Sequence, residues 1–174
     1  MESSKADDKE QVEKYKQLYS MAEAAFRDEE NRYSRIQDQA FKYDPIILFL
    51  LGVAGFLAKW IRDELRTATD CWGCGAMTSL VLAFGCLIVA AFVLLVSRLY
   101  GKTKSFRPDQ RDVEFFDAYD LTTLYRAYAR RFHDETRTNA KITDKKARRV
   151  VWAHALICLS SGLLIITGLI WILR

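Results

Sequence analysis

The sequence predicts an all-α integral membrane protein with three transmembrane helices and long cytoplasmic amphipathic helices. Two uncharged runs carry this prediction, Met77 to Ser97 and Val150 to Leu173. Each reaches the roughly 20 apolar residues that a helix needs to cross a hydrocarbon core of about 30 Å. A chain of 174 residues is too small to bury both runs inside a soluble core, so we interpret them as spans two and three.

The first span is shorter. Ile46 to Ala58 is an apolar run whose length also suits a re-entrant or interfacial helix, which is the alternative. Two features favour a span. Asp44 and Pro45 form a helix start with proline at the first helical position, and Tyr43 and Trp60 bracket the run as interface anchors do.

Lysine and arginine near the ends of spans set the orientation of a membrane protein. Most of the 26 Lys and Arg residues precede span one or separate spans two and three, and only Arg174 follows span three. We therefore expect a cytoplasmic N-terminus and a C-terminus on the outer side of the membrane. The predicted segments are a cytoplasmic amphipathic helix (1–43), span one (44–62), an external connection (63–76), span two (77–98), a cytoplasmic basic helical region (99–149) and span three (150–174).

The N-terminal segment reads as one long helix over residues 5–42, because its apolar residues recur at spacings near three and four. The stripe consists of Val12, Tyr15, Leu18, Ala22, Ala25, Phe26, Tyr33, Ile36 and Ala40. The other face is dense with charge. This pattern predicts packing on another helix, of the same chain or of a neighbouring one.

A second helical pattern begins near Asp109. Its apolar face is formed by Val113, Phe116, Leu121, Leu124, Tyr128 and Phe132. Since no helix breaker follows before the end of span three, one helix is expected to run from the cytoplasm through the membrane. An interruption near Asn139 is the alternative.

This second helix is strongly basic and carries interleaved aromatic rings. Cations beside stacking rings are how proteins hold a nucleotide or a single-stranded nucleic acid. The candidate ligand-binding residues are Arg126, Arg130, Arg131, Arg137, Tyr125 and Tyr128. The alternative is structural: the rings form a buried face, and the juxtamembrane cations contact anionic lipids.

Span three carries a small and weakly polar stripe in which His154, Ser161 and Gly168 follow each other seven residues apart, with Ser160 and Thr167 beside them. Such a stripe is either a helix-helix contact or a pore lining. Three spans of one chain enclose no aqueous path, so we expect a homo-oligomer in the lipid bilayer.

The sequence holds no constellation typical of an enzyme. It has two histidines, no carboxylate pair within a span and no Gly-rich phosphate loop. We therefore expect neither catalysis nor a cofactor nor a metal site. Cys71 and Cys74 form a CxxC pair, which is found in redox motifs and zinc sites. The sequence lacks both the thioredoxin-like βαβ pattern of a redox motif and the second Cys or His pair of a zinc site. We therefore expect a structural pair or free thiols. If the two cysteines react, we expect a strained local disulfide between them.

The layout resembles that of small bacterial antiphage membrane effectors of the SLATT and Pycsar-effector-like groups. The residues that carry the resemblance are Tyr19-Ser-Met-Ala-Glu-Ala-Ala-Phe, Glu30-Asn-Arg-Tyr, Gln39-Ala, Asn139-Ala-Lys, Lys145-Lys-Ala and Ala153. The similarity covers nearly the whole chain and is one of layout and spacing. The third span fits the Pycsar-effector-like layout better than the two-span SLATT core.

The resemblance implies an effector of the bacterial inner membrane, with its C-terminus in the periplasm, that stays silent until phage infection. A partner nucleotidyltransferase would then make a nucleotide or oligonucleotide signal, which the effector senses on its cytoplasmic side before it permeabilises or depolarises the inner membrane. The channel effectors of Hailong-type systems are one such subgroup. Two other functions stay open: a membrane-anchored scaffold whose cytoplasmic helices recruit a protein partner, and a membrane protein that tethers nucleic acid without a pore.

Overall fold

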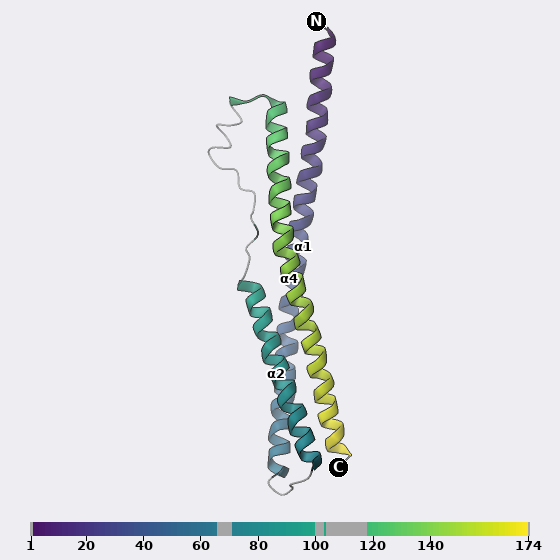
Figure 1. The fold of residues 1–174 in the computed structure, drawn as a ribbon, viewed down its shortest axis with the longest axis vertical. Helices are drawn as coiled ribbons and strands as arrows, with labels where there is room; N and C mark the ends of the chain where they lie inside the picture. Colours follow the sequence, from purple (N-terminus) through teal and green to yellow (C-terminus); the bar gives the residue numbers. More distant parts are fainter. Residues whose placement is uncertain (1, 66–70, 100–102, 104–117, 174) are drawn as a thin grey trace. The chain divides into compact units, whose positions relative to one another are not determined.

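The computed structural model describes residues 2–65, 71–99, 103 and 118–173 (Figure 1). Its long helices are α1 (Glu2–Leu65), α2 (Cys71–Leu99) and α4 (Leu121–Ile172), and the described residues include no strand. Each of the three helices contains a stretch long and apolar enough to cross a membrane. The predicted all-α class with three membrane-spanning helices is therefore confirmed.

The chain divides into two compact units. The first, here called the charged unit, contains α1 up to Arg35 and α4 up to Asp144. The second, here called the membrane unit, contains α1 from Ile36, the whole of α2, and α4 from Lys145. Both α1 and α4 contribute to each unit as single helices.

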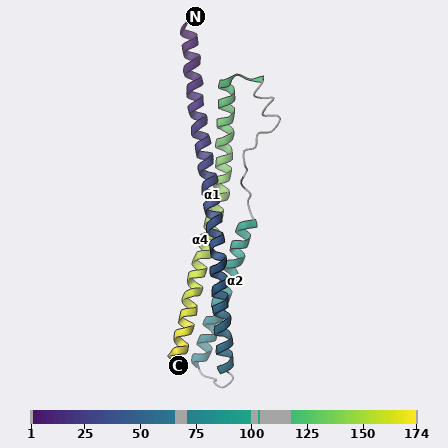
Figure 2. The ribbon, with the colours of Figure 1, turned by 180° about the vertical axis from the view of Figure 1, so that it is seen from behind.

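The membrane unit is a bundle in which α2 runs antiparallel to α1 and α4 (Figure 1, Figure 2). Its buried positions on α1 follow a seven-residue repeat: Ala40, Ile47, Ala54 and Ile61. On α4 they alternate by three and four residues: Val150, Ala153, Ile157, Ser160, Leu164, Thr167 and Trp171. This period is that of helices packed as in a coiled coil, with knobs in holes. Small residues at several of these positions let the helix backbones come close.

The predicted helix start at Asp44 and Pro45 is wrong, because α1 continues through Pro45. A proline inside a helix removes one backbone hydrogen bond and crowds the carbonyl four residues earlier, here that of Phe41. The helix persists because residues on both sides of the proline are fixed by packing. Ala40 and Ile47 are buried in one apolar cluster with Ala90 and Leu94 of α2.

Other predictions about the helices meet different outcomes. Phe26 and Ala40 of the N-terminal stripe are buried, whereas Leu18 and Ala25 are exposed, so the contact face is narrower than the sequence indicated. α4 is uninterrupted at Asn139. Asp109, Val113 and Phe116 lie outside the described residues.

The CxxC pair is described only in part. Cys74 is an exposed free thiol near the start of α2, and the side chain of Cys71 lies outside the described part of the chain. The free-thiol alternative is therefore favoured over the expected local disulfide.

Candidate ligand groove and polar seams

In the charged unit, aromatic rings of α1 and α4 meet in tilted and edge-on pairs. The ring centroids of Tyr19 and Tyr125 lie 5.6 Å apart, and Tyr19 also meets Phe132 at 5.6 Å. Phe26 lies 5.4 Å from Phe132 in a tilted arrangement. Distances and tilts of this kind are favourable for aromatic pairs. Because the earlier residue of α1 pairs with the earlier residue of α4, the two helices are parallel in this unit.

The two tyrosines that the sequence predicts to bind a ligand, Tyr125 and Tyr128, take part in this helix contact. Tyr128 is buried, and Tyr125 is half-buried against Tyr19. Burial raises the pKa of Tyr19, and the neighbouring Glu23 carboxylate adds to the rise. The placement of Tyr125 and Tyr128 agrees with the structural alternative, in which the rings form a buried face. Their role in ligand binding stays a prediction.

Three of the four nominated arginines share one open face of α4. Arg126, Arg130 and Arg137 are all exposed, and so is His133. Their spacings of four, three and four residues place these side chains in one row along the helix. Arg131 lies on another face, half-buried, with its Nε 3.4 Å from Glu135 Oε1. The row of Arg126, Arg130, His133 and Arg137 is called the basic row below.

A groove runs between the two helices beside this row. Its volume is about 620 Å³, and it is lined by Leu18, Met21 and Ala22 of α1 and by Ala129, Arg130, His133 and Asp134 of α4. Small-molecule sites typically have volumes of roughly 300–1,000 Å³ and are apolar with a few polar groups. Met21, one of the lining residues, is 71% exposed. The groove therefore joins an apolar floor to a polar edge, where the Arg130 guanidinium lies among the lining residues with His133 and the acidic Asp134.

Sequence reasoning did not find this groove. The sequence pattern predicts that Leu18 belongs to the helix contact, and it predicts no role for Met21. The signal was present in the spacing, because Leu18, Met21, Ala22 and Ala25 form a second apolar strip next to the one that holds Tyr19 and Phe26. A single sequence does not say which of two neighbouring strips packs on the partner helix.

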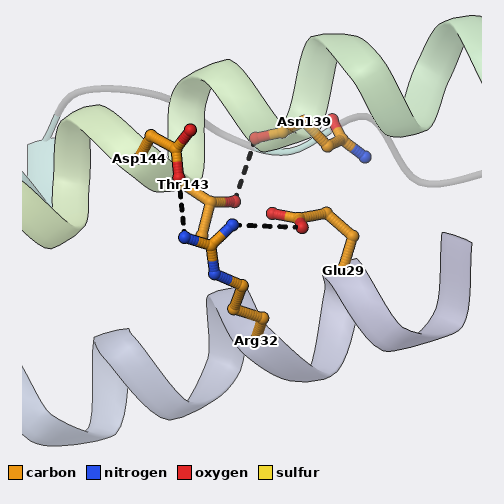
Figure 3. A network of polar contacts seen from close by, with 5 residues as sticks. All are labelled: Glu29, Arg32, Asn139, Thr143 and Asp144. Carbon is orange, nitrogen blue, oxygen red and sulfur yellow. Dashed lines mark hydrogen bonds and ion pairs between the residues drawn. The ribbon is translucent and has the colours of Figure 1, made fainter. Parts of the chain in front are cut away.

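A polar network lies between α1 and α4 near the end of the charged unit (Figure 3). Arg32 Nη2 lies 2.6 Å from Asp144 Oδ1, and Arg32 Nη1 lies 3.5 Å from Glu29 Oε2. The hydrogen bond with Asp144 raises the pKa of Arg32. On α4, Thr143 Oγ1 donates to the carbonyl oxygen of Asn139 at 2.9 Å.

Burial in this network is uneven. Arg32 and Asp144 are about half-exposed, whereas Glu29, Asn139 and Thr143 are buried. Glu29 Oε1 meets no hydrogen-bond partner among the described residues. A buried carboxylate oxygen without a partner is costly for folding. Polar groups at the core positions of paired helices are used to fix their register, which is the role that suits Glu29.

In the membrane unit, the three residues nominated on span three lie beside the packed seam. His154 is exposed, and Ser161 and Gly168 are half-buried. The buried residues are their neighbours Ser160 and Thr167. No atom lies within 4 Å of a Cβ built on Gly168. Within one chain the row of His154, Ser161 and Gly168 is thus not the main helix contact, and its roles in a pore or between copies stay predictions.

His154 itself has two polar neighbours. Its Nδ1 lies 3.1 Å from the Tyr43 hydroxyl, and its Nε2 lies 3.6 Å from Cys158 Sγ. Cys158 is exposed on the same face of α4. Polar side chains within membrane helices usually face protein or water, because exposure to lipid is unfavourable.

Hydroxyl groups join α2 to α4 inside the membrane unit. Ser160 Oγ donates to the carbonyl of Ala83 at 3.1 Å, and Ser79 Oγ donates to the carbonyl of Leu163 at 3.1 Å. Thr167 Oγ1 contacts Ser79 Oγ at 3.0 Å. Interhelical hydrogen bonds of this kind stabilise membrane bundles modestly.

Residues 30–174 match the family model described as the Pycsar effector protein domain. The match covers most of the chain, including the membrane unit and the α4 side of the groove. The chain belongs to this family. As a Pycsar effector domain it is a membrane effector of antiphage defence, as the resemblance in the sequence implied. The comparison with curated proteins found no match, and neither did the comparison with solved structures.

The match also divides the groove. Ala129, Arg130, His133 and Asp134 lie within the Pycsar effector domain, whereas Leu18, Met21 and Ala22 precede its first matched residue.

Among the described residues, no group of three or more His, Cys, Asp or Glu side chains could hold a metal ion.

Proposed function

We propose that this Pycsar effector domain forms an oligomeric pore, gated by a nucleotide or oligonucleotide signal that binds to the charged unit on the cytoplasmic side. The observation that carries the proposal is the basic row at the edge of an apolar groove of about 620 Å³. A phosphate group would pair with Arg130 and its neighbours, because guanidinium groups bind phosphate oxygens with charge-assisted hydrogen bonds. A base would lie on the apolar floor formed by Leu18, Met21 and Ala129.

Two continuous helices extend from the proposed binding site into the membrane unit. α4 carries the basic row near its start and continues without a break to Ile172, and α1 carries the floor of the groove and continues to Leu65. A ligand that changes how α1 and α4 pack in the charged unit therefore acts on two of the helices that enter the membrane unit. Such a ligand shifts a two-state equilibrium by its difference in affinity for the two states.

The pore itself requires several copies. The hydroxyl groups of Ser79, Ser160 and Thr167 are already used between α2 and α4 of one chain. The row of His154, Cys158, Ser161 and Gly168 is the polar face of α4 that remains outside this contact. We expect it to meet a second copy or water in the oligomer, and opening of the assembly to depolarise the inner membrane.

A scaffold that recruits a protein is the second candidate, and the exposure of Met21 and Leu18 favours it. Both are large apolar side chains that a protein partner, such as the nucleotidyltransferase, would cover. In this alternative the charged unit binds protein in place of a nucleotide, and no pore forms.

Ligand binding is tested with the purified full-length protein, a panel of 3′,5′-cyclic mononucleotides and short oligonucleotides. We expect Arg130→Ala and Met21→Glu to weaken the binding of the active probe at least roughly tenfold, because each removes one side of the groove. Arg27→Ala is the matched control, since Arg27 is an exposed arginine of α1 that pairs with Glu23 and does not line the groove. Equal affinity of wild type and Arg130→Ala would place the site elsewhere.

Pore formation is tested in cells with a membrane-potential dye and by cross-linking. In a variant whose only remaining cysteine is Cys158, we expect an oxidant to produce a covalent dimer. The same variant with Cys158→Ser stays monomeric on a denaturing gel. A chain that never depolarises cells expressing it with its nucleotidyltransferase during phage infection, and yet retains a protein partner, supports the scaffold.

A further inference from the structure

Pro45 creates a weak point in α1 within the membrane unit. Proline has no N–H group, so the carbonyl of Phe41 receives no helical hydrogen bond from position 45. The turn that precedes the proline, residues 40–44, therefore contains one backbone carbonyl without its helical donor, as the end of a helix does. A hydrogen-bond donor from another helix is the natural stabiliser of such a turn.

Arg98 of α2 places a donor on this turn, at the carbonyl of Ala40, one residue before the carbonyl that Pro45 leaves without its helical donor. Its Nη2 donates to the carbonyl oxygen of Ala40 at 2.8 Å and to Asp44 Oδ1 at 2.7 Å. The guanidinium carbon also lies 4.4 Å from the centroid of the Phe41 ring, within the range of a cation–π contact. All three contacts fall on the one turn that comes directly before Pro45. Arg98 lies in the last turn of α2, so it fastens that end of α2 to the weak point of α1.

The two partners of Arg98 differ in their exposure to water. The Arg98 side chain is 23% exposed and that of Asp44 is 44% exposed, so water is only partly excluded from the ion pair. Ala40 is buried, and a charge-assisted hydrogen bond gains strength where water is excluded. Removing one partner of such a pair leaves the other unpaired in a partly dry place, which is the more damaging change.

The same junction contains two polar atoms that are poorly satisfied. Arg98 Nε and Ser97 Oγ are buried and meet no hydrogen-bond partner among the described residues. Each raises the free energy of the fastened arrangement. Arg98 therefore makes good hydrogen bonds with Nη2, whereas its Nε and the neighbouring Ser97 Oγ are unsatisfied. This balance suits a contact that opens and closes.

We propose that Arg98 is a latch: its bonds to Ala40 and Asp44 hold the Pro45 turn of α1 against the end of α2 and keep the pore closed. Arg98 is a positioning residue, because it acts through α1 and touches no ligand. When the latch opens, α1 is free to bend at Pro45 and α2 to separate from it. This inference rests on the proposed pore function.

The test measures dye release from vesicles of phosphatidylethanolamine and phosphatidylglycerol that contain the full-length protein, without any nucleotide. We expect Arg98→Ala to raise the resting leak by roughly tenfold, which is what loss of a charge-assisted hydrogen bond does to a two-state equilibrium. Asp44→Ala should raise it less, because the bond to the Ala40 carbonyl remains. In the double variant, the Asp44 substitution should add nothing to Arg98→Ala.

Lys42→Ala is the matched control, since Lys42 is an exposed cation on the same turn of α1. Arg98→Lys keeps the charge with fewer donors and should give an intermediate leak if the protein folds. A resting leak in Arg98→Ala equal to that of wild type overturns the latch, provided that wild type leaks with one of the cyclic mononucleotides. If neither wild type nor any variant leaks under any condition, the pore function itself fails, and the latch with it.

Discussion

Arg32 and Asp144 join α1 to α4 by an ion pair of 2.6 Å between residues 112 positions apart in the chain. It is the shortest polar link drawn in Figure 3, and it lies close to the point where the charged unit ends. The pair joins two helices that are distant in the chain. Its contribution to stability depends on how far its two side chains are exposed to water.

Both side chains of this pair are about half-exposed, at 48% and 52%, so water weakens their attraction. We predict a coupling energy of about 0.2–1 kcal/mol in a double-mutant cycle of Arg32→Ala and Asp144→Ala, falling as salt is added. The measurement is urea unfolding of the detergent-solubilised protein, followed by circular dichroism. A coupling insensitive to salt would mean that the pair is less hydrated than its exposure indicates.

The aromatic contact should contribute far more to stability. Phe132 is 5% exposed and meets both Tyr19 and Phe26. We predict that Phe132→Ala destabilises the charged unit by about 3–5 kcal/mol, since it leaves a cavity between the helices. Leu121→Ala, at a residue 57% exposed, serves as the control and should change stability by less than about 0.5 kcal/mol. Thermal unfolding reports both.

Glu29 offers a change in the opposite direction. Its carboxylate is buried, one oxygen meets no partner among the described residues, and Arg32 keeps Asp144 if Glu29 is removed. We predict that Glu29→Leu leaves stability unchanged or raises it by about 1 kcal/mol, because an apolar side chain avoids the desolvation of the carboxylate. The stability of Glu29→Gln should lie between that of wild type and that of Glu29→Leu. A loss above about 2 kcal/mol would show that Glu29 is better satisfied than its contacts indicate.

Inside the membrane unit, the α2–α4 hydroxyl contacts can be removed one at a time. We predict that Thr167→Val and Ser160→Ala each destabilise the bundle by about 0.6 kcal/mol, the average for interhelical hydrogen bonds in membranes. Thr78→Val is the matched control, because the Thr78 hydroxyl donates to Cys74 within α2 and is exposed. Unfolding in mixed micelles measures the difference, and an equal effect of all three substitutions would argue against a special role for the α2–α4 contact.

The start of α4 should be sensitive to acid. Asp120 precedes the helix, its carbonyl accepts from the amide of Leu124 at 3.1 Å, and a hydrogen bond with the Thr123 side chain lowers the pKa of its carboxyl. Because the folded pKa is lower than the unfolded one, the stabilisation is present above the unfolded pKa. It is lost as the pH falls through the folded pKa.

NMR titration of the Asp120 carboxyl carbon tests this expectation. We predict a midpoint below that of an ordinary aspartate, and a return towards the ordinary value in Thr123→Val. Asp120→Asn keeps a capping side chain and should remove the acid sensitivity of the first turn. If the midpoint stays the same in Thr123→Val, the lowering has another origin.

Part of this protein follows from its sequence alone. The uncharged runs Met77–Ser97 and Val150–Leu173 determined spans two and three, because hydrocarbon accepts few charges and a fixed thickness sets the length of a span. The helical period placed Phe26 and Ala40 on a contact face, and the spacing of Arg126, Arg130 and Arg137 put them in one row. These are local properties, readable from residues a few turns apart.

Other features were decided by the tertiary structure. Leu18 and Phe26 belong to one predicted stripe on α1, and only packing against α4 shows that Tyr19 and Phe26 are covered while Leu18 and Met21 line a groove. The sequence offered two neighbouring strips on α4, and packing on α2 buried Ser160 and Thr167 beside the predicted row. Pro45 is typical of a helix start, and only packing on both sides of it keeps α1 continuous there. On α1 and α4, adjacent helical strips differ by one residue in the chain, and the neighbouring helix selects between them. At Pro45 the deciding contacts come from another helix, which the local sequence does not contain.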